Sequence, residues 1–192
     1  MVEVEAPLAS LGTPHRFTVD AYHRMLETGI LDEDDHVELL EGVIVEMSPQ
    51  GKAHAGVIVR LTRLLVLSLG ESFDVRPQLP LTLDEQSEPE PDLAVVPAGA
   101  EGSAEHPSHA LLVVEVANAS LARDREVKAR LYARASIPEY WLVDVGRKSI
   151  EVYRDPDATQ GRYRSREVRS GGEVLECRAL PGVSLPLLRI FG

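Results

Sequence analysis

Residues 89–96 read PEPDLAVV and residues 110–116 read ALLVVEV, and these two runs decide the fold. Each run is an apolar strand with one carboxylate near its end. The segment between them, residues 97–109, is rich in Gly, Pro, Ser and charge, which predicts a loop. The uninterrupted Leu-Leu-Val-Val run of the second strand is typical of a central strand covered on both faces. We therefore expect two neighbouring strands in the middle of a sheet.

The register of these strands decides what their carboxylates do. If they pair as antiparallel neighbours with Val96 opposite Leu111, Asp92 lies opposite Glu115 and both acids share one face. Opposed residues have Cβ atoms roughly 5 Å apart, so two ionised carboxylates in a partly buried site repel each other. A divalent cation removes that repulsion, and Mg²⁺ binds one or two carboxylates with water and phosphate oxygens. In another register the acids are a solvated pair at a strand end, and both interpretations stay open.

Length, charge and composition limit the class of protein. The chain has 192 residues and is 44% hydrophobic, so we predict a flexible leader over residues 1–16 and a single domain over residues 17–192. The net charge of −11 disfavours broad, non-specific binding of nucleic acid. No apolar run has the length of a membrane span, and no signal-peptide pattern is present. We expect a cytoplasmic protein without a membrane partner, and a core position for the lone Cys177.

Hydrophobic periodicity and turn residues predict the elements around the two strands. Helices and strands follow one another in an order that favours an α/β fold, with helices covering a mixed sheet. Pro77 and Pro80 mark the strand before the acidic pair as an edge or bulged strand. Turns punctuate the chain from Tyr163 to Phe191 and predict a C-terminal β extension. The other predicted elements are a helix between Thr18 and Gly29, hairpin strands at 37–40 and 43–47, helices at 52–69 and 121–135, and strands at 73–83, 139–145 and 149–154.

Lys128 is the third residue of interest. It lies one helical turn after Asp124, itself a further candidate, and the simplest interpretation is an exposed ion pair worth roughly a few tenths of a kcal/mol. The helix nevertheless follows the Glu115 strand by a short connection, and its first turns can return over the end of that strand. Lys128 is then within reach of the acidic pair. The sequence leaves both positions open.

Taken in order, these residues resemble a known group. A Pro-Asp that opens one strand, a Glu on the next and a Lys close by resemble the PD-(D/E)XK nuclease superfamily. More narrowly, the chain resembles the Uma family of restriction-endonuclease-like proteins over residues 17–154, with a weaker continuation to Phe191. The motifs that carry the resemblance are ELLEGVIVEMSP at 38–49 with a His shortly after, PEPDLAVV at 89–96, LVVEVANAS at 112–120, DREVKARLYARASIPEYWLVD at 124–144 and IEVYR at 150–154.

The resemblance implies a restriction-endonuclease-like fold and a metal-dependent endonuclease that cleaves DNA as a homodimer. It implies Asp92 and Glu115 as metal ligands and catalytic residues, with Mg²⁺ as the cofactor and Mn²⁺ as a substitute. Lys128 matches the catalytic Lys that the family carries on this helix. Ala117 stands where the superfamily usually has that Lys, and residues 118–120 depart from the Ser-Pro-Ser common in the family.

Other polar residues near these motifs are weaker candidates. Glu46 ends a strand before the first long helix, where superfamily members often add an acidic ligand, although a solvated strand end is the simpler interpretation. His54 either caps the apolar stripe of that helix or serves the site. Gln78 has a structural role or touches the substrate or metal-bound water. We interpret Glu38 and Glu41 as turn or surface charges.

Two other classes of function stay open. A non-catalytic interaction or regulatory module on a nuclease scaffold is favoured by the net charge of −11, since a stand-alone DNA enzyme usually displays more basic surface. A metal-dependent phosphatase acting on small molecules would use the same site. The intact acidic pair with its Lys favours the endonuclease, and the sequence does not distinguish DNA from RNA as substrate.

Overall fold

The centre of the computed structural model is a six-stranded sheet. Its strands are β3 (Phe73–Pro77), β4 (Leu93–Pro97), β5 (Leu112–Ala117), β6 (Glu139–Asp144), β7 (Ser149–Asp157) and β8 (Arg162–Ser170). They lie side by side in that order, and neighbours are antiparallel except β5 and β6, which are parallel. The structure describes residues 13–49, 51–99, 106–117 and 120–192, so residues 1–12 of the predicted leader lie outside it.

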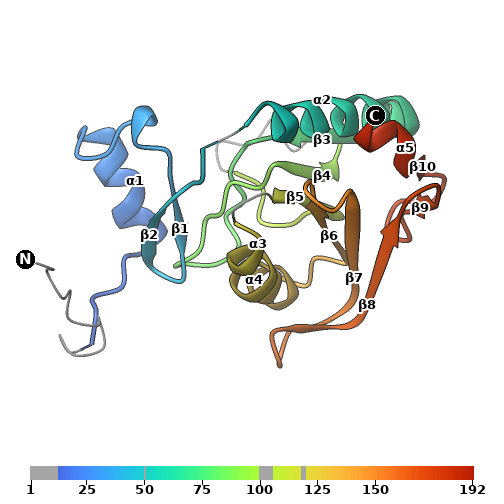
Figure 1. The fold of residues 1–192 in the computed structure, drawn as a ribbon. Coiled ribbons are helices and arrows are strands. Elements are labelled where there is room, and N and C mark those ends of the chain that lie inside the picture. The colour runs from blue at the N-terminus through green and yellow to red at the C-terminus, as the bar shows by residue number, and fades with distance from the viewer. Residues whose placement is uncertain (1–12, 50, 100–105, 118–119) are drawn as a thin grey trace, which may run out of the picture.

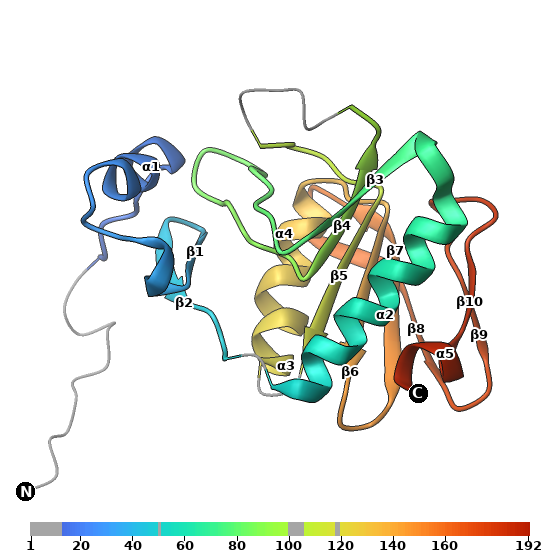
Figure 2. The same cartoon turned by 90° about the horizontal axis from the view of Figure 1, so that it is seen from above.

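Helices cover both faces of this sheet (Figure 2). On one face lies α2 (Lys52–Leu69), whose fully buried Leu61 and Leu65 pack in one core cluster with side chains of β4, β5 and β6. On the other face lies α4 (Ala129–Arg134), whose Tyr132 packs in a second cluster with residues of the same strands. Burial of each such side chain contributes roughly 1.5–3 kcal/mol, so the sheet is stabilised from both sides. The predicted α/β fold with a mixed sheet between helices is confirmed.

The N-terminal helix and hairpin form a unit beside the sheet (Figure 1). The turn of the hairpin requires Gly42, because its φ is 75° and a Cβ there would lie 2.7 Å from the Cβ of Arg16. Leu39 joins the unit to the segment before β4 through two backbone hydrogen bonds with Glu88. The elements of the unit are α1 (Val19–Glu27), capped by Thr18, a 3₁₀ turn (Glu33–Asp35), and the antiparallel strands β1 (Val37–Leu40) and β2 (Val43–Glu46).

The predicted C-terminal β extension is present as a second small sheet. Its strands are β9 (Val174–Glu176) and β10 (Ser184–Pro186), and Cys177 beside them is buried in the core, as expected. A short helix that the sequence did not predict, α5 (Leu187–Phe191), follows and lies against α2. Arg60 of α2 donates a hydrogen bond of 2.6 Å to a carbonyl of α5. A helix of this length is too short for an apolar period to be visible in the sequence.

Of the two registers left open for the acidic pair, the structure has the one that places both acids on one face. Leu93 lies opposite Val114 and Val95 lies opposite Leu112 in the antiparallel ladder of β4 and β5. Asp92 directly precedes β4, and continuing the ladder by one residue places it opposite Glu115. All residues of β5 are buried, as expected of a central strand with helices on both sides.

The strand predicted over residues 73–83 is shorter than expected. It is an edge strand, as predicted, but it ends at Pro77. Gln78 then takes a positive φ of 52°, which turns the chain out of the extended conformation. The alternation of apolar and polar residues after this point therefore does not reflect a strand.

One helix is longer and more apolar than we expected, since the sequence analysis found no segment with the length of a membrane span. Lys52–Ser72, which contains α2, is by length and composition alone long and apolar enough to cross a membrane. Its buried stripe packs on the sheet, and core helices of globular domains pass the same test of length and composition. The segment is therefore weak evidence for a membrane span.

Candidate active site

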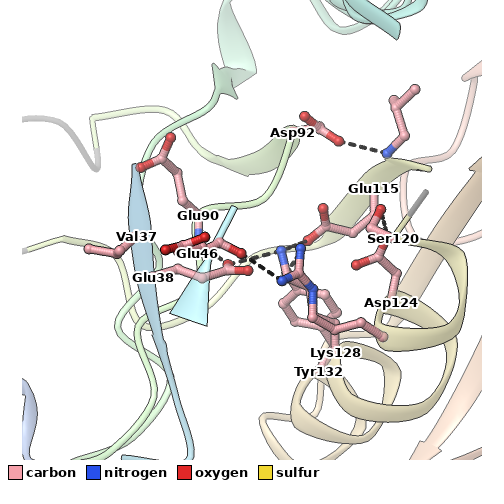
Figure 3. Close-up of polar contacts among 12 residues, drawn as sticks. Val37, Glu38, Glu46, Glu90, Asp92, Glu115, Ser120, Asp124, Lys128 and Tyr132 are labelled. Carbon is pink, nitrogen blue, oxygen red and sulfur yellow. Dashed lines mark hydrogen bonds and ion pairs between the residues drawn. The ribbon is translucent and has the colours of Figure 1, made fainter. Parts of the chain in front are cut away.

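Asp92 enters the site from the beginning of β4. Its Oδ2 accepts a hydrogen bond of 2.7 Å from the backbone N–H of Val116 (Figure 3). Nε2 of His54 lies 3.1 Å from the same oxygen. The hydrogen bond to Asp92 raises the pKa of His54, and burial opposes this effect. Oδ1 has no hydrogen bond or ion pair with the described residues. His54 therefore does more than cap the stripe of α2: its ring and the β5 backbone fix one carboxylate oxygen and leave the other unused.

Glu115 is anchored in the same way, through one of its two carboxylate oxygens. Its Oε1 accepts hydrogen bonds from Lys128 Nζ at 2.9 Å and from the Tyr132 hydroxyl at 2.6 Å. Oε2 has no hydrogen-bond or ion-pair partner among the described residues. Burial raises the pKa of Glu115 to about 8; Lys128 opposes the rise, and the nearby carboxylates of Asp124 and Asp92 add to it. A cation beside Oε2 would offset this cost of ionisation.

Lys128 is buried, so the interpretation as an exposed ion pair with Asp124 is wrong. Its side chain is 5% exposed, and Nζ lies 2.9 Å from both Glu115 Oε1 and Glu38 Oε2 (Figure 3). Burial alone would lower the pKa of Lys128, but attraction to Glu115, Glu38 and Asp124 outweighs it and raises the pKa well above its usual range. The ammonium group therefore stays charged inside the site.

A π-helical segment explains why Lys128 turns inward. The helix predicted over residues 121–135 consists of α3 (Leu121–Arg123), a π segment (Asp124–Lys128) and α4. The wider π turn rotates the buried face, so Asp124 and Lys128 are both buried while Val127, which we expected to face inward, is only partly buried. A regular 3.6-residue period cannot predict this rotation.

Asp124 lies at the base of the same cavity. The Ser120 hydroxyl donates a hydrogen bond of 2.6 Å to Oδ2 of Asp124. Burial raises the pKa of Asp124, and the positive charge of Lys128 opposes the rise. The pair of Asp124 and Lys128 is thus part of the buried site, with Lys128 bonded to other acids.

Glu38 is a site residue that the sequence did not reveal. We interpreted it as a turn or surface charge, yet it is 1% exposed and bonds Lys128 through Oε2. It shares one face of β1 with the buried Leu40, and this two-residue alternation is the sequence signal that could have indicated burial. Glu41, by contrast, is the turn charge that we expected, and it pairs with Arg130 and Arg134 at 2.6 and 2.8 Å.

The chain is similar to a known protein family and to a solved structure. A family model described as "Uma2: Putative restriction endonuclease" matches residues 19–188. The chain belongs to the Uma2 family. No curated protein matches it. It is similar to a crystal structure of "a putative nuclease belonging to DUF820" from Anabaena variabilis ATCC 29413, with a TM-score of 0.71, 16% identity, and coverage of 91% of this chain and 97% of that one. At this identity the similarity supports the fold alone.

Two weaker candidates take different places in this Uma2 chain. Glu46 is exposed and does not line the cavity; its backbone carbonyl accepts a hydrogen bond of 2.8 Å from Arg123. Gln78 lines the cavity just after the end of β3. Glu90 lines it too, and burial together with the negative charge of Glu38 raises its pKa. Of the acids on the hairpin, it is Glu38, and not Glu46, that contacts Lys128.

The donor set of this Uma2 site fits a magnesium ion held partly by water. No group of three or more His, Cys, Asp and Glu side chains is arranged as a metal site in the described part of the chain. Mg²⁺, however, usually binds one or two carboxylates and keeps several waters. The cavity of about 660 Å³ has room for them, and Asp92 Oδ1 and Glu115 Oε2 are unused oxygens of two carboxylates that are anchored through their other oxygen. The cavity is lined by more carboxylates than Arg and Lys side chains, so its charge favours binding of a cation. The acids are Glu38, Glu90, Asp92, Glu115 and Asp124, and the basic residues are Arg123 and Lys128.

Proposed function

We propose that this chain is a metal-dependent endonuclease that hydrolyses phosphodiester bonds in DNA. The observation that carries the proposal is one cavity with two anchored carboxylates, each with an unused oxygen, beside a buried ammonium group. Membership of the Uma2 family supports it. Asp92 and Glu115 would hold Mg²⁺, with Mn²⁺ as a substitute, and the bound ion would activate water and stabilise negative charge on the phosphate.

The residues of the chain have distinct tasks in this proposal. His54 and the Val116 backbone orient Asp92, and Tyr132 orients Glu115. The Lys128 ammonium group has three protons, of which Glu115 and Glu38 accept two. Its remaining proton is available to a phosphate oxygen or to the attacking water. Lys128 thus neutralises the charge that develops on the phosphate as water attacks.

A cleavage assay tests this function. We expect nicking or cutting of plasmid, linear duplex or single-stranded DNA when Mg²⁺ or Mn²⁺ is present, and none after the metal is chelated. An RNA substrate and a small generic phosphodiester, run in parallel, distinguish a ribonuclease and a small-molecule phosphatase. Activity no higher than that of an Asp92→Ala control would contradict the proposal.

A non-catalytic interaction module is the second candidate, and the net charge of −11 favours it. Calorimetry separates the two candidates before a substrate is known. The endonuclease requires a saturable Mg²⁺ or Mn²⁺ site that Asp92→Asn removes, whereas a module that has lost catalysis has no need for one.

We also propose that the chain acts as a homodimer. Cutting both strands of a duplex generally needs two active sites, and this chain supplies one candidate site. Sedimentation velocity is expected to show a dimer at micromolar concentration. A monomer at the highest concentration used in the cleavage assay would contradict this expectation.

A further inference from the structure

We propose that Glu38 is a positioning residue that holds the Lys128 ammonium group in place, and that the N-terminal hairpin is thereby part of the catalytic centre. The inference rests on the proposed function, because it assigns a task within the same site. It goes beyond that function in giving a catalytic purpose to a unit outside the six-stranded sheet.

The first argument is the geometry around Lys128. Its Nζ lies 2.9 Å from Glu38 Oε2 and 2.9 Å from Glu115 Oε1. With both oxygens at hydrogen-bond distance, the ammonium group cannot rotate freely, and the direction of its third proton is fixed. Glu115 alone would leave a long, flexible side chain with a single anchor. Glu38 supplies the second point that determines where the charge lies.

The second argument is how Glu38 itself is fixed. Its Oε2 also accepts a hydrogen bond of 3.2 Å from the backbone N–H of Glu90, two residues before Asp92. The neighbouring Leu39 pairs with Glu88 through backbone hydrogen bonds of 3.3 and 2.8 Å. The hairpin is therefore attached to the same segment that delivers Asp92. Glu38 links this segment to Lys128 across the cavity.

The third argument is the cost of the arrangement. Glu38 is 1% exposed, and its Oε1 is buried without a hydrogen-bond partner among the described residues. A buried oxygen left unpaired is unfavourable, and buried ion pairs are often replaceable by apolar residues without loss of stability. Folding alone therefore gives little reason for a carboxylate at this position. The need to hold the Lys128 ammonium group in place does give a reason for this carboxylate.

The chain offers a matched control for the test. Glu41, at the turn of the same hairpin, also bonds the helix that follows β5, through Arg130 and Arg134, but it does not line the cavity. Glu41→Gln weakens two ion pairs of the hairpin and changes no group that contacts Lys128. Glu38→Gln keeps the shape of the side chain without its charge, and Glu38→Ala removes it.

Two readouts are measured on these variants. The lysines of the chain are Lys52, Lys128 and Lys148, and the other two are exposed, so ¹⁵N-lysine labelling allows the Lys128 ammonium signal to be assigned by Lys128→Arg and followed by NMR. We expect a slowly exchanging Lys128 signal in the native protein and exchange at least roughly tenfold faster in Glu38→Ala. We expect kcat to fall roughly tenfold to a hundredfold with little change in KM, since misplacing a reacting group has effects of this size. Glu38→Gln should lie between the two, and Glu41→Gln should match the native protein.

The outcomes separate this inference from the proposed function. Folded Glu38→Gln and Glu38→Ala proteins with native kcat and native Lys128 exchange would overturn it. Equal losses in Glu41→Gln would also overturn it, because docking of the hairpin would then explain the effect. If the native protein cleaves no substrate, the proposed function fails, while the Lys128 signal still decides whether Glu38 positions that group. If Glu38→Ala does not fold, the isosteric Glu38→Gln decides alone.

Discussion

Asp92→Asn is expected to lower DNA cleavage by on the order of a thousandfold or more. The change keeps the shape of the side chain but removes the negative charge from one of the two carboxylates proposed to hold the metal. Metal ions contribute several kcal/mol to the stabilisation of a transition state, and each 1.4 kcal/mol is a factor of ten in rate. Cleavage of supercoiled plasmid at saturating Mg²⁺, measured in a single turnover, gives the ratio directly.

The fold should tolerate this change well. Asp92 lines a cavity with excess negative charge, so neutralising it removes repulsion from Glu115 and Glu90. We therefore expect the free energy of unfolding without metal to stay the same or to increase. Glu126→Gln is the matched control, because Glu126 is an exposed acid on the neighbouring helix that does not line the cavity. Equal cleavage rates for Asp92→Asn and Glu126→Gln would remove Asp92 from the site.

Lys128→Ala is expected to have two separate effects. Turnover should fall roughly a hundredfold or more, the scale for losing one group that stabilises a transition state. The free energy of unfolding should fall by about 3–5 kcal/mol, because Glu115 and Glu38 are left buried without their shared cation. Chemical denaturation measures the second effect, and cleavage per folded molecule measures the first.

Two further variants separate charge from geometry at this position. Lys128→Arg keeps the positive charge, but its planar guanidinium cannot place that charge between Glu115 and Glu38 as a compact ammonium group does, so it should not restore full turnover. Lys128→Met should be more stable than Lys128→Ala because it fills the same space. Native turnover per folded molecule in Lys128→Ala would show that Lys128 has no catalytic part.

The elements that the sequence predicted best are those with strong, local patterns. The predicted helix over residues 52–69 coincides with α2, because its apolar stripe is long and Gly51 and Gly70 flank it. The register of the acidic strands stayed open in the sequence, because both faces of β4 and β5 are buried and a shift by one residue exposes no apolar side chain. The ladder of β4 and β5 in the structure decides in favour of the register that places Asp92 opposite Glu115.

The parts that sequence did not predict depend on contacts between distant segments. The position of Lys128 beside the acids was one of two open interpretations and the one that the resemblance implied, but the π segment that presents it leaves no trace in a hydrophobic period. The burial of Glu38 depends on a hairpin that meets a helix about ninety residues later in the chain, so no local pattern pairs it with Lys128. The orientation of the His54 ring toward Asp92 likewise comes from the packing of α2 on the sheet. Each is a tertiary contact that propensity and alternation do not contain.

Anomalous diffraction from crystals soaked in Mn²⁺ tests the central claim most directly. The proposed site predicts one strong peak between Asp92 and Glu115, about 2.0–2.2 Å from Asp92 Oδ1 and Glu115 Oε2, with water in the other positions. The same soak of Asp92→Asn crystals should show no peak there. A native crystal without a peak between these carboxylates, at a Mn²⁺ concentration that supports cleavage in solution, would contradict the claim.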